Sequence, residues 1–277
     1  MSLYDLHTHS TASDGAYAPA ELVRQAGAAG VTVLALTDHD STEGLGEAES
    51  AAREAGIQLI PGVEISATWA DKTIHIVGLR IDRRADALKL GLSRLQATRL
   101  ERAEEIGRRL DRHGIPGTFE AAREMAGDGM ITRTHFARHL AGLGLAGSVK
   151  DVFERFLTRG KPGYVPTRWA EMAEAVDWIR SAGGVAVLAH PQRYKLTGSW
   201  MRRLIGEFKE CGGRALEVVS GTASPGETQS SAEYARRFEL CASSGSDFHS
   251  PETAWLKLGR LPPLPADLVP VWTLWNH

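Results

Sequence analysis

The chain has 277 residues, of which 43% are hydrophobic, so it can bury a sizeable core and is not expected to be disordered. A formal net charge of −2, without an extended run of Lys and Arg, argues against non-specific binding to long nucleic acid. Cys211 and Cys241 form no disulfide or thiolate pattern, and neither a leader nor a run of about 18 apolar residues is present. We therefore expect a soluble cytoplasmic protein without membrane contact.

The first sixty residues alternate between short apolar runs and helical segments. Pro19 is suited to the first turn of a helix, and Gly30 and Gly56 are suited to end helices. The pattern predicts, in chain order, a strand at 3–7, a helix at 20–29, a strand at 31–36, a helix at 42–55 and a strand at 57–60.

A further strand is predicted at 73–79, and the alternation resumes near residue 171. The remaining predicted elements are helices at 171–181, 200–211 and 229–238 and strands at 185–188, 215–219 and 240–242. Repeated βα units of this kind predict an α/β fold with a parallel sheet, either open or closed into a barrel.

Residues 94–165 differ from the rest because helices follow one another there without strands. The predicted helices are 95–113, 119–126, 134–141 and 149–158, and this block has more Lys and Arg than Asp and Glu. It is either an insertion with solvated faces or a cap that brings cations over an anionic ligand. The predicted domains are thus a barrel of residues 1–93 and 166–277 and a helical cap of residues 94–165.

Histidines and carboxylates stand at the ends of several predicted strands. The carboxyl ends of strands in βα architectures lie at one end of the sheet, so these residues can converge. One strand-end histidine alone is more often structural than a metal ligand, but nine such residues at equivalent places indicate a metal site. They are His7, His9, Asp14, His39, Glu64, His75, His190, Asp247 and His249.

Imidazole and carboxylate groups without thiolate suit manganese, zinc or iron. Nine ligands exceed what one ion can use, so we expect two or three divalent metal ions, with Glu64 as a possible bridge between two of them. Paired ions activate a water molecule and neutralise phosphoryl charge during displacement at phosphorus. The pattern therefore favours hydrolysis of a phosphate ester without a protein nucleophile.

Six segments resemble, in order, the motifs of the PHP (polymerase and histidinol phosphatase) family. They are His7-Thr8-His9, Ser13-Asp14-Gly15, Thr37-Asp38-His39-Asp40, Pro61-Gly62-Val63-Glu64, Ala189-His190-Pro191 and Gly245-Ser246-Asp247-Phe248-His249. The resemblance implies a distorted (β/α)7 barrel with an inserted all-helical subdomain and a trinuclear centre in which manganese is the preferred ion.

The resemblance also implies which residues share each ion. One ion would bind His7, His9, Glu64 and Asp247, a second would bind Glu64, His75 and His190, and a third would bind Asp14, His39 and His249. No ligand position is missing, which argues against a metal-binding regulatory module that has lost catalysis.

The helical block resembles the insertion of PHP phosphoesterases that act on nucleotides. This likeness lies in residues 131–137, where Thr132 replaces the usual glycine, and in residues 160–166. It implies a hydrolase in which metal-activated hydroxide removes the 3′-phosphate of a nucleoside 3′,5′-bisphosphate. Close relatives also trim short 5′-phosphorylated RNA from its 5′ end, so the expected partner is a small nucleotide or a short oligonucleotide.

Substrate residues are less strongly indicated. Arg133 can bind phosphate in a bidentate manner, His135 can donate to an oxygen or protonate the leaving group, and Arg193 and Lys161 are further candidates. For each of these the alternative is ordinary surface charge. Asp38 either orients a metal ligand from behind or caps the following helix, and it is included among the catalytic candidates with Arg133 and His135.

Three other functions are compatible with parts of the pattern. A 5′-to-3′ exoribonuclease acting on short RNA would use the same site, whereas a histidinol-phosphate-type phosphatase has no need for a basic cap. An amidohydrolase acting on C–N bonds would also use a barrel metal centre, but the order of the motifs disfavours it. The sequence predicts no particular oligomeric state.

Overall fold

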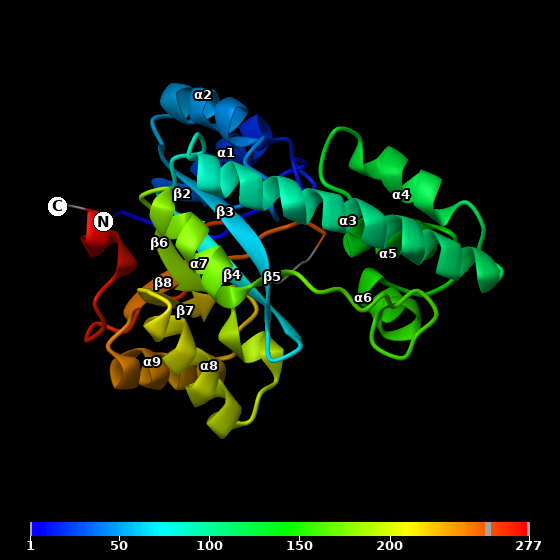
Figure 1. The fold of residues 1–277 in the computed structure, drawn as a ribbon. Helices are drawn as coiled ribbons and strands as arrows, with labels where there is room; N and C mark the ends of the chain where they lie inside the picture. The colour runs from blue at the N-terminus through cyan, green and yellow to red at the C-terminus, as the bar shows by residue number, and fades with distance from the viewer. Residues whose placement is uncertain (1, 253–255, 276–277) are drawn as a thin grey trace.

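The computed structural model describes residues 2–252 and 256–275. A curved sheet surrounded by helices forms the larger part, and a lobe of helices extends from one side of it (Figure 1). In chain order the elements are β1 (Tyr4–Asp5), α1 (Pro19–Ala28), β2 (Val33–Leu36), α2 (Leu45–Ala55), β3 (Gln58–Trp69), β4 (Lys72–Leu79), α3 (Asp86–Arg112), α4 (Thr118–Ala126), α5 (Arg133–Gly142), α6 (Val149–Val152), the π-helical turn η1 (Phe153–Leu157), β5 (Ala170–Glu171), α7 (Met172–Ser181), β6 (Val185–Leu188), the 3₁₀ turn η2 (Pro191–Tyr194), α8 (Gly198–Glu210), β7 (Ala215–Ser220), α9 (Pro225–Phe238), β8 (Cys241–Gly245) and the 3₁₀ turn η3 (Val271–Trp275).

Seven strands form a nearly closed barrel in the order β1-β2-β3-β4-β6-β7-β8, and the short β5 pairs with β3. Backbone hydrogen bonds join its first and last strands and the residues that follow them: Leu6 N–H donates to Ser244 O at 3.0 Å, Asp247 N–H to His7 O at 2.8 Å and His9 N–H to Phe248 O at 3.0 Å. The predicted barrel fold is therefore confirmed.

The sheet is mixed, so the expectation of a wholly parallel sheet is wrong at β4. This strand runs antiparallel to both β3 and β6. Only Ala70 and Asp71 separate β3 from β4, and both have a positive φ, of 45° and 59°. A two-residue turn of this kind joins antiparallel neighbours, whereas a parallel crossover needs a dozen or more residues.

Helix α3 joins the barrel to the helical lobe (Figure 1). Leu88 and Leu92 near its start belong to the main hydrophobic core. Ile106 and Leu110 near its end belong to a second core that lies within the lobe. The helix thus runs across the boundary predicted between residues 93 and 94, and the division into barrel and cap stays a prediction.

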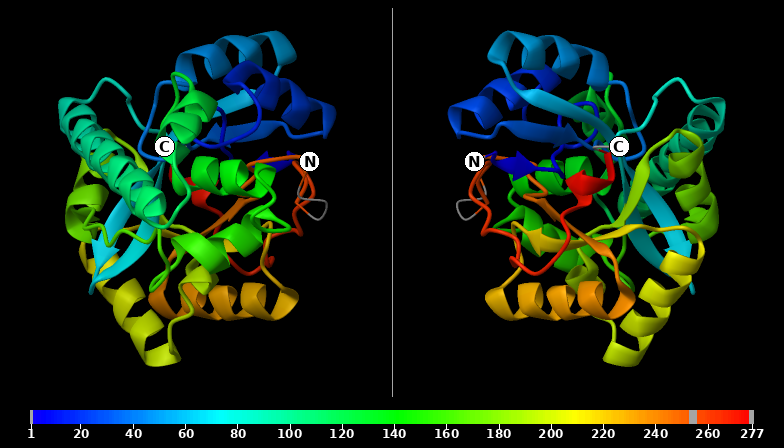
Figure 2. Two further views of the ribbon diagram at one scale, coloured as in Figure 1. Left: turned by 90° about the vertical axis from the view of Figure 1, so that its right-hand side faces the viewer. Right: turned by 90° about the vertical axis from the view of Figure 1, so that its left-hand side faces the viewer.

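Different segments cover the two ends of the barrel (Figure 2). The lobe faces one end, and η3 lies at the other, where Trp272 stacks on Tyr4 with ring centroids 3.8 Å apart. Val271 is buried there, and Arg80 donates to Trp275 O at 2.7 Å. The end that faces the lobe is therefore the one left for a ligand. None of the helices in the described ranges is both long and apolar enough to cross a bilayer.

Closure of the barrel depends on a glycine at the end of β8. A Cβ added to Gly245 would lie 2.2 Å from the Cβ of His7 and 2.8 Å from its backbone nitrogen. We predict that Gly245→Ala lowers the free energy of unfolding by about 1–3 kcal/mol, because the first and last strands would be forced apart. Urea unfolding measures this.

Gly226→Ala is the matched control, because a Cβ at Gly226 in α9 would meet nothing within 4 Å. It should leave stability unchanged or raise it. Equal stability of the Gly245 variant and the wild type would contradict the prediction.

Candidate metal centre and adjoining cavity

The nine predicted ligands meet at the lobe-facing end of the barrel. His7 and His9 follow β1, His39 follows β2, and Glu64 and His75 lie within the β3–β4 hairpin. His190, Asp247 and His249 follow β6 and β8, and Asp14 lies in the loop after His9. Their convergence from six strands is the arrangement expected for a site at one end of a barrel.

The fully buried carboxylate of Glu64 lies at the middle of this group. Five imidazoles surround it: Oε1 lies 3.4 Å from His7 Nε2, 2.8 Å from His75 Nδ1 and 3.0 Å from His190 Nε2, and Oε2 lies 3.4 Å from His9 Nε2 and 2.8 Å from His39 Nδ1. Burial raises the pKa of Glu64, but charge on these rings, His75 foremost, holds it well below its ordinary value. The group is therefore an ionised carboxylate.

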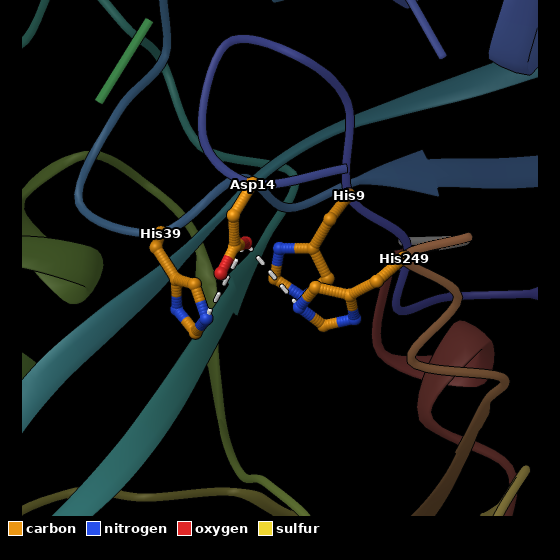
Figure 3. A group of neighbouring side chains, drawn as sticks. All are labelled: His9, Asp14, His39 and His249. Carbon is orange, nitrogen blue, oxygen red and sulfur yellow. Dashed lines mark ion pairs between the residues drawn. The ribbon is translucent and has the colours of Figure 1, made fainter. Parts of the chain in front are cut away.

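A second group gathers around Asp14 (Figure 3). Its Oδ1 lies 3.3 Å from His249 Nε2 and 3.9 Å from His39 Nε2, and the His9 ring stacks on that of His249 at 4.0 Å. The other oxygen, Oδ2, accepts the hydroxyl groups of two threonines at the start of α5, at 2.9 and 2.8 Å. Asp14 is thus held in place from the lobe, and Oδ1 faces the imidazoles.

These side chains fit divalent cations. Three sets have donor atoms within 4.8 Å of one another: His9 with Asp14, His39 and His249; His7 with His9 and Glu64; and His39 with Glu64 and His75. Among the described residues, buried atoms such as His7 Nε2, Asp14 Oδ1 and Glu64 Oε2 have no hydrogen-bond partner. Such atoms are costly to bury unless a ligand satisfies them. Burial also lowers the pKa of His9 to about 3, which keeps its ring neutral for coordination.

The sets resemble the predicted ones without matching them fully. Asp14, His39 and His249 fall together, as do His7, His9 and Glu64, but His39 takes the place predicted for His190 beside Glu64 and His75. Asp247 approaches from β8, with Oδ1 3.1 Å from His9 Nε2. The assignment of each ligand to one ion stays a prediction.

Three residues of the site or its borders have backbones in the left-handed region. Asp40, His190 and Asp247 have φ values of 48°, 26° and 56°. Residues other than glycine rarely adopt such angles, and they are found at sites where surrounding structure holds them. All three stand where a strand has just ended, so the strain turns the chain sharply toward the metal centre.

Asp38 and Asp40 both support this centre. Asp38 accepts the backbone N–H of Ser10 at 2.8 Å and the hydroxyl of Ser13 at 2.6 Å, so it holds the loop between His9 and Asp14. Burial raises the pKa of Asp38 to about 6. Asp40 pairs with Arg99 at 2.6 Å. The described contacts put Asp38 behind the loop, and its catalytic role stays a prediction.

Glu217, in the middle of β7, contacts a predicted metal ligand and is not among the residues that the sequence pattern indicates. Its Oε2 lies 2.7 Å from Nδ1 of His7, and both side chains are buried. A carboxylate on the far ring nitrogen fixes the orientation and tautomer of a ligating histidine. The signal was present in the sequence as one acidic residue inside the apolar run 215–219.

A cavity of about 550 Å³ opens beside the metal centre, between the barrel and the lobe. Asp14, His39 and His75 line its inner end. Six cationic side chains line it as well: Lys72, Arg99, Arg102, Arg133, Arg159 and Arg168. Its size is within the range of about 300–1,000 Å³ typical of small-ligand sites.

Three of these arginines, Arg102, Arg133 and Arg159, have no salt bridge within residues 2–252 and 256–275. Arg102 and Arg133 are half-buried, whereas Arg159 is exposed. Burial, together with the charges of Arg133 and Arg99, lowers the pKa of Arg102 to about 9, and burial also lowers that of Arg133. An anion bound between Arg102 and Arg133 would raise the pKa of both side chains, because its negative charge would offset their burial and mutual repulsion.

Of the four residues predicted to bind substrate, only Arg133 lines this cavity. His135 is buried at the start of α5, where its Nδ1 accepts the N–H of Thr132 at 3.0 Å. Arg193 contacts Asp247 and donates to Thr222 Oγ1 at 3.0 Å, beside a smaller cavity of about 180 Å³. Lys161 is exposed on the loop after η1 and lines neither cavity.

Thr132, at the position where the resembling motif has glycine, has two functions. It is the N-cap of α5, accepting the N–H of Thr134 at 3.1 Å, and its hydroxyl donates to Asp14 at 2.9 Å. The substitution therefore gives the lobe a direct hydrogen bond to the metal centre.

Removal of the Glu217 carboxylate should weaken metal binding. We predict that Glu217→Ala lowers the affinity of the metal-stripped protein for Mn²⁺ by about 10- to 100-fold, and that Glu217→Gln, which keeps an acceptor oxygen, recovers part of the loss. Calorimetric titration measures this. Glu233→Ala, an exposed change on α9, is the control, and unchanged affinity in Glu217→Ala would refute the assignment.

Comparison with known proteins agrees with this geometry. The PHP domain family model matches residues 5–184. The chain is 46% identical to the 5′-3′ exoribonuclease Rnm of Escherichia coli K12 over 277 residues, which cover 99% of this chain and 94% of that protein. It is also 46% identical to the 3′,5′-nucleoside bisphosphate phosphatase of Chromobacterium violaceum over 273 residues, covering 98% and 96% of the two chains.

A solved structure of an amidohydrolase from Chromobacterium violaceum, with bound sulfate and no metal, has the same architecture. It superposes with a TM-score of 0.95 at 45% identity, over 99% of this chain and 95% of that chain. Together with the imidazole and carboxylate cluster, these matches identify the family and the reaction class. The chain belongs to the PHP family of metal-dependent phosphoesterases and is a phosphoric ester hydrolase.

Proposed function

We propose that this enzyme removes the 3′-phosphate from nucleoside 3′,5′-bisphosphates with two or three divalent ions, preferably manganese. One observation carries the proposal: a single cavity reaches from His39 and His75 to the unpaired guanidinium groups of Arg102 and Arg133. A ligand that fills it has one anionic group beside the metal ligands and a second beside the arginines. A nucleoside with two phosphates has this charge pattern.

Each half of the cavity has a separate task in this proposal. Bound metal ions would activate water and neutralise charge on the 3′-phosphate. Arg102 and Arg133 would bind the 5′-phosphate through paired N–H donors, which hold the nucleotide in one orientation. Because these arginines are already desolvated, they lose little further hydration when the phosphate binds.

The other predicted residues would assist. Arg193 would approach the phosphoryl group from the side of Asp247, which it already contacts. His135 would keep Thr132 and the start of α5 in place, and Lys161 would contribute only long-range attraction. This ranking follows from the contacts of each residue, since none of the three lines the cavity of about 550 Å³.

The same site supports a second activity, 5′-to-3′ hydrolysis of short 5′-phosphorylated RNA. The cavity is lined at its outer rim by residues of the β3–β4 hairpin and of the segment before β5, including Asp71, Lys72 and Arg168. The 3′-phosphate of a bisphosphate corresponds to the first internucleotide phosphate of such an RNA. The names of the exoribonuclease and phosphatase relatives are consistent with one site serving both substrates.

The decisive experiment measures hydrolysis by the Mn²⁺-loaded protein. Adenosine 3′,5′-bisphosphate is compared with 3′-AMP, histidinol phosphate and a 5′-phosphorylated trinucleotide RNA. We expect the highest kcat/KM for the bisphosphate, followed by the trinucleotide. Preference for histidinol phosphate, or equal rates with 3′-AMP, would contradict the proposed role of the arginines.

Arg102→Ala and Arg133→Ala should each raise KM for the bisphosphate by about 10- to 100-fold, the loss expected for a hydrogen bond to a charged group. KM for 3′-AMP, which has no 5′-phosphate, should change much less. Arg108→Ala is a matched control on the exposed face of α3, where Arg108 pairs with Glu105 at 3.0 Å. An equal effect on both substrates would argue against a 5′-phosphate site.

His9→Ala should abolish hydrolysis of every substrate, because His9 lies in two of the three metal-binding sets. Chelation of metal from the wild type should have the same effect, and added Mn²⁺ should restore activity to the wild type alone. Metal analysis of the purified variant checks the cause. Activity retained after full chelation would contradict metal dependence.

A further inference from the structure

An exposed tryptophan lies just outside the cavity, on the first turn of α8. Trp200 is 39% exposed, and its ring meets that of Trp69 edge to face, with centroids 5.5 Å apart and an interplanar angle of 85°. The Arg203 guanidinium lies 5.4 Å from the Trp200 ring, and Lys72 Nζ lies 5.8 Å from it. We call Trp69, Lys72, Trp200 and Arg203 the Trp200 patch.

The patch is continuous with the catalytic cavity. Lys72 belongs to both, because it lines the cavity and contacts Trp200. It lies three residues from His75 along β4, a span of about 10 Å at the rise of a β-strand. Figure 1 shows the tip of the β3–β4 hairpin beside α8. A bound oligonucleotide that extends from the metal centre along β4 therefore reaches Trp200 next.

The two tryptophans of the patch differ in their surroundings. Trp69 is only 4% exposed, and its indole N–H donates to Glu207 Oε2 at 2.6 Å, so it serves as a buried support. The indole N–H of Trp200 has no hydrogen bond to another residue in the described part of the chain. Its edge-to-face contact with Trp69 holds the ring at a fixed angle while leaving part of it in water.

We propose that the Trp200 patch stacks the base of the nucleotide that follows the scissile phosphate in a short 5′-phosphorylated RNA. Lys72 contacts the phosphate on its 3′ side. Aromatic side chains stack bases regardless of sequence, and nearby cations bind the backbone. The inference rests on the exoribonuclease activity proposed above and assigns it a second nucleotide site.

The charges around the ring favour a polyanion over an apolar partner. Lys72 has no salt bridge within residues 2–252 and 256–275, so its ammonium group is available for a phosphate. Arg203 pairs with Glu207 at 2.7 Å, and its guanidinium lies 5.5 Å from the Trp69 ring and 5.4 Å from the Trp200 ring. A second copy of the chain would have to bury the Lys72 ammonium group against its own surface, which costs free energy unless a carboxylate meets it.

The test compares Trp200→Ala and Trp200→Phe with the wild type on two substrates. We expect Trp200→Ala to raise KM for a 5′-phosphorylated trinucleotide about tenfold, the loss typical of one stacked base, and to leave KM for the bisphosphate unchanged. Trp200→Phe should recover most of the loss, because phenylalanine also stacks. Leu90→Ala, which alters an exposed apolar residue elsewhere on the barrel, is the control.

Binding of a fluorescent 2′-O-methyl trinucleotide with a 5′-phosphate, followed by anisotropy, separates this inference from the activity on which it rests. Weaker binding to Trp200→Ala supports the patch even if turnover is slow. Equal binding, or an equal loss on both substrates, overturns it. A change of oligomeric state with unchanged KM also overturns it and assigns the patch to a second copy.

If the wild type hydrolyses the bisphosphate but neither binds nor cleaves the trinucleotide, the patch inference fails and the phosphatase proposal stands.

Discussion

The architecture of the site depends on one ionised carboxylate enclosed by imidazoles. Glu64 is fully buried, and a buried charge is tolerated only where opposite charge surrounds it. Two backbone hydrogen bonds join Glu64 to the loop after β2. Glu64 N–H donates to Asp38 O at 3.1 Å, and Asp40 N–H donates to Glu64 O at 2.9 Å. The strand that carries Glu64 and the loop that carries His39 therefore move as one unit. Divalent ions held by Glu64 and these imidazoles would share that rigidity.

Helix α3 extends this unit into the lobe. Arg99 contacts Asp40 beside His39, and Arg102, one turn further along, faces the cavity. Both guanidinium groups lie over the ring of Trp169, at 5.1 and 5.2 Å. Arg102, one of the two groups proposed to bind the 5′-phosphate, is thus connected through one continuous helix to the loop that carries His39. In the proposed function, this connection would position the two phosphates as much as the individual side chains would.

Much of the site was predictable from the sequence because strand ends converge in a barrel whatever their separation along the chain. That geometric rule predicts the convergence of His9 and His249, whose rings stack with centroids 4.0 Å apart. The antiparallel β4 was not predictable, because the turn Ala70–Asp71 lacks the glycine or asparagine that usually marks a tight hairpin. Glu217 was missed because a polar residue inside an apolar run has no visible partner until β1 and β7 are folded around the same centre. Lys161 does not line the cavity, because proximity to a motif in sequence does not fix the direction of a loop.

The stacking of Trp272 on Tyr4 joins the beginning and the end of the described chain at the barrel end opposite the cavity. Attachments at either terminus, such as a fusion partner or a surface tether, would project away from the substrate entrance. Because the two ends lie side by side, a short linker between them and a new opening elsewhere would give a circular permutant with the same barrel. The enzyme is therefore suited to immobilisation through its termini, with the catalytic face directed toward solution.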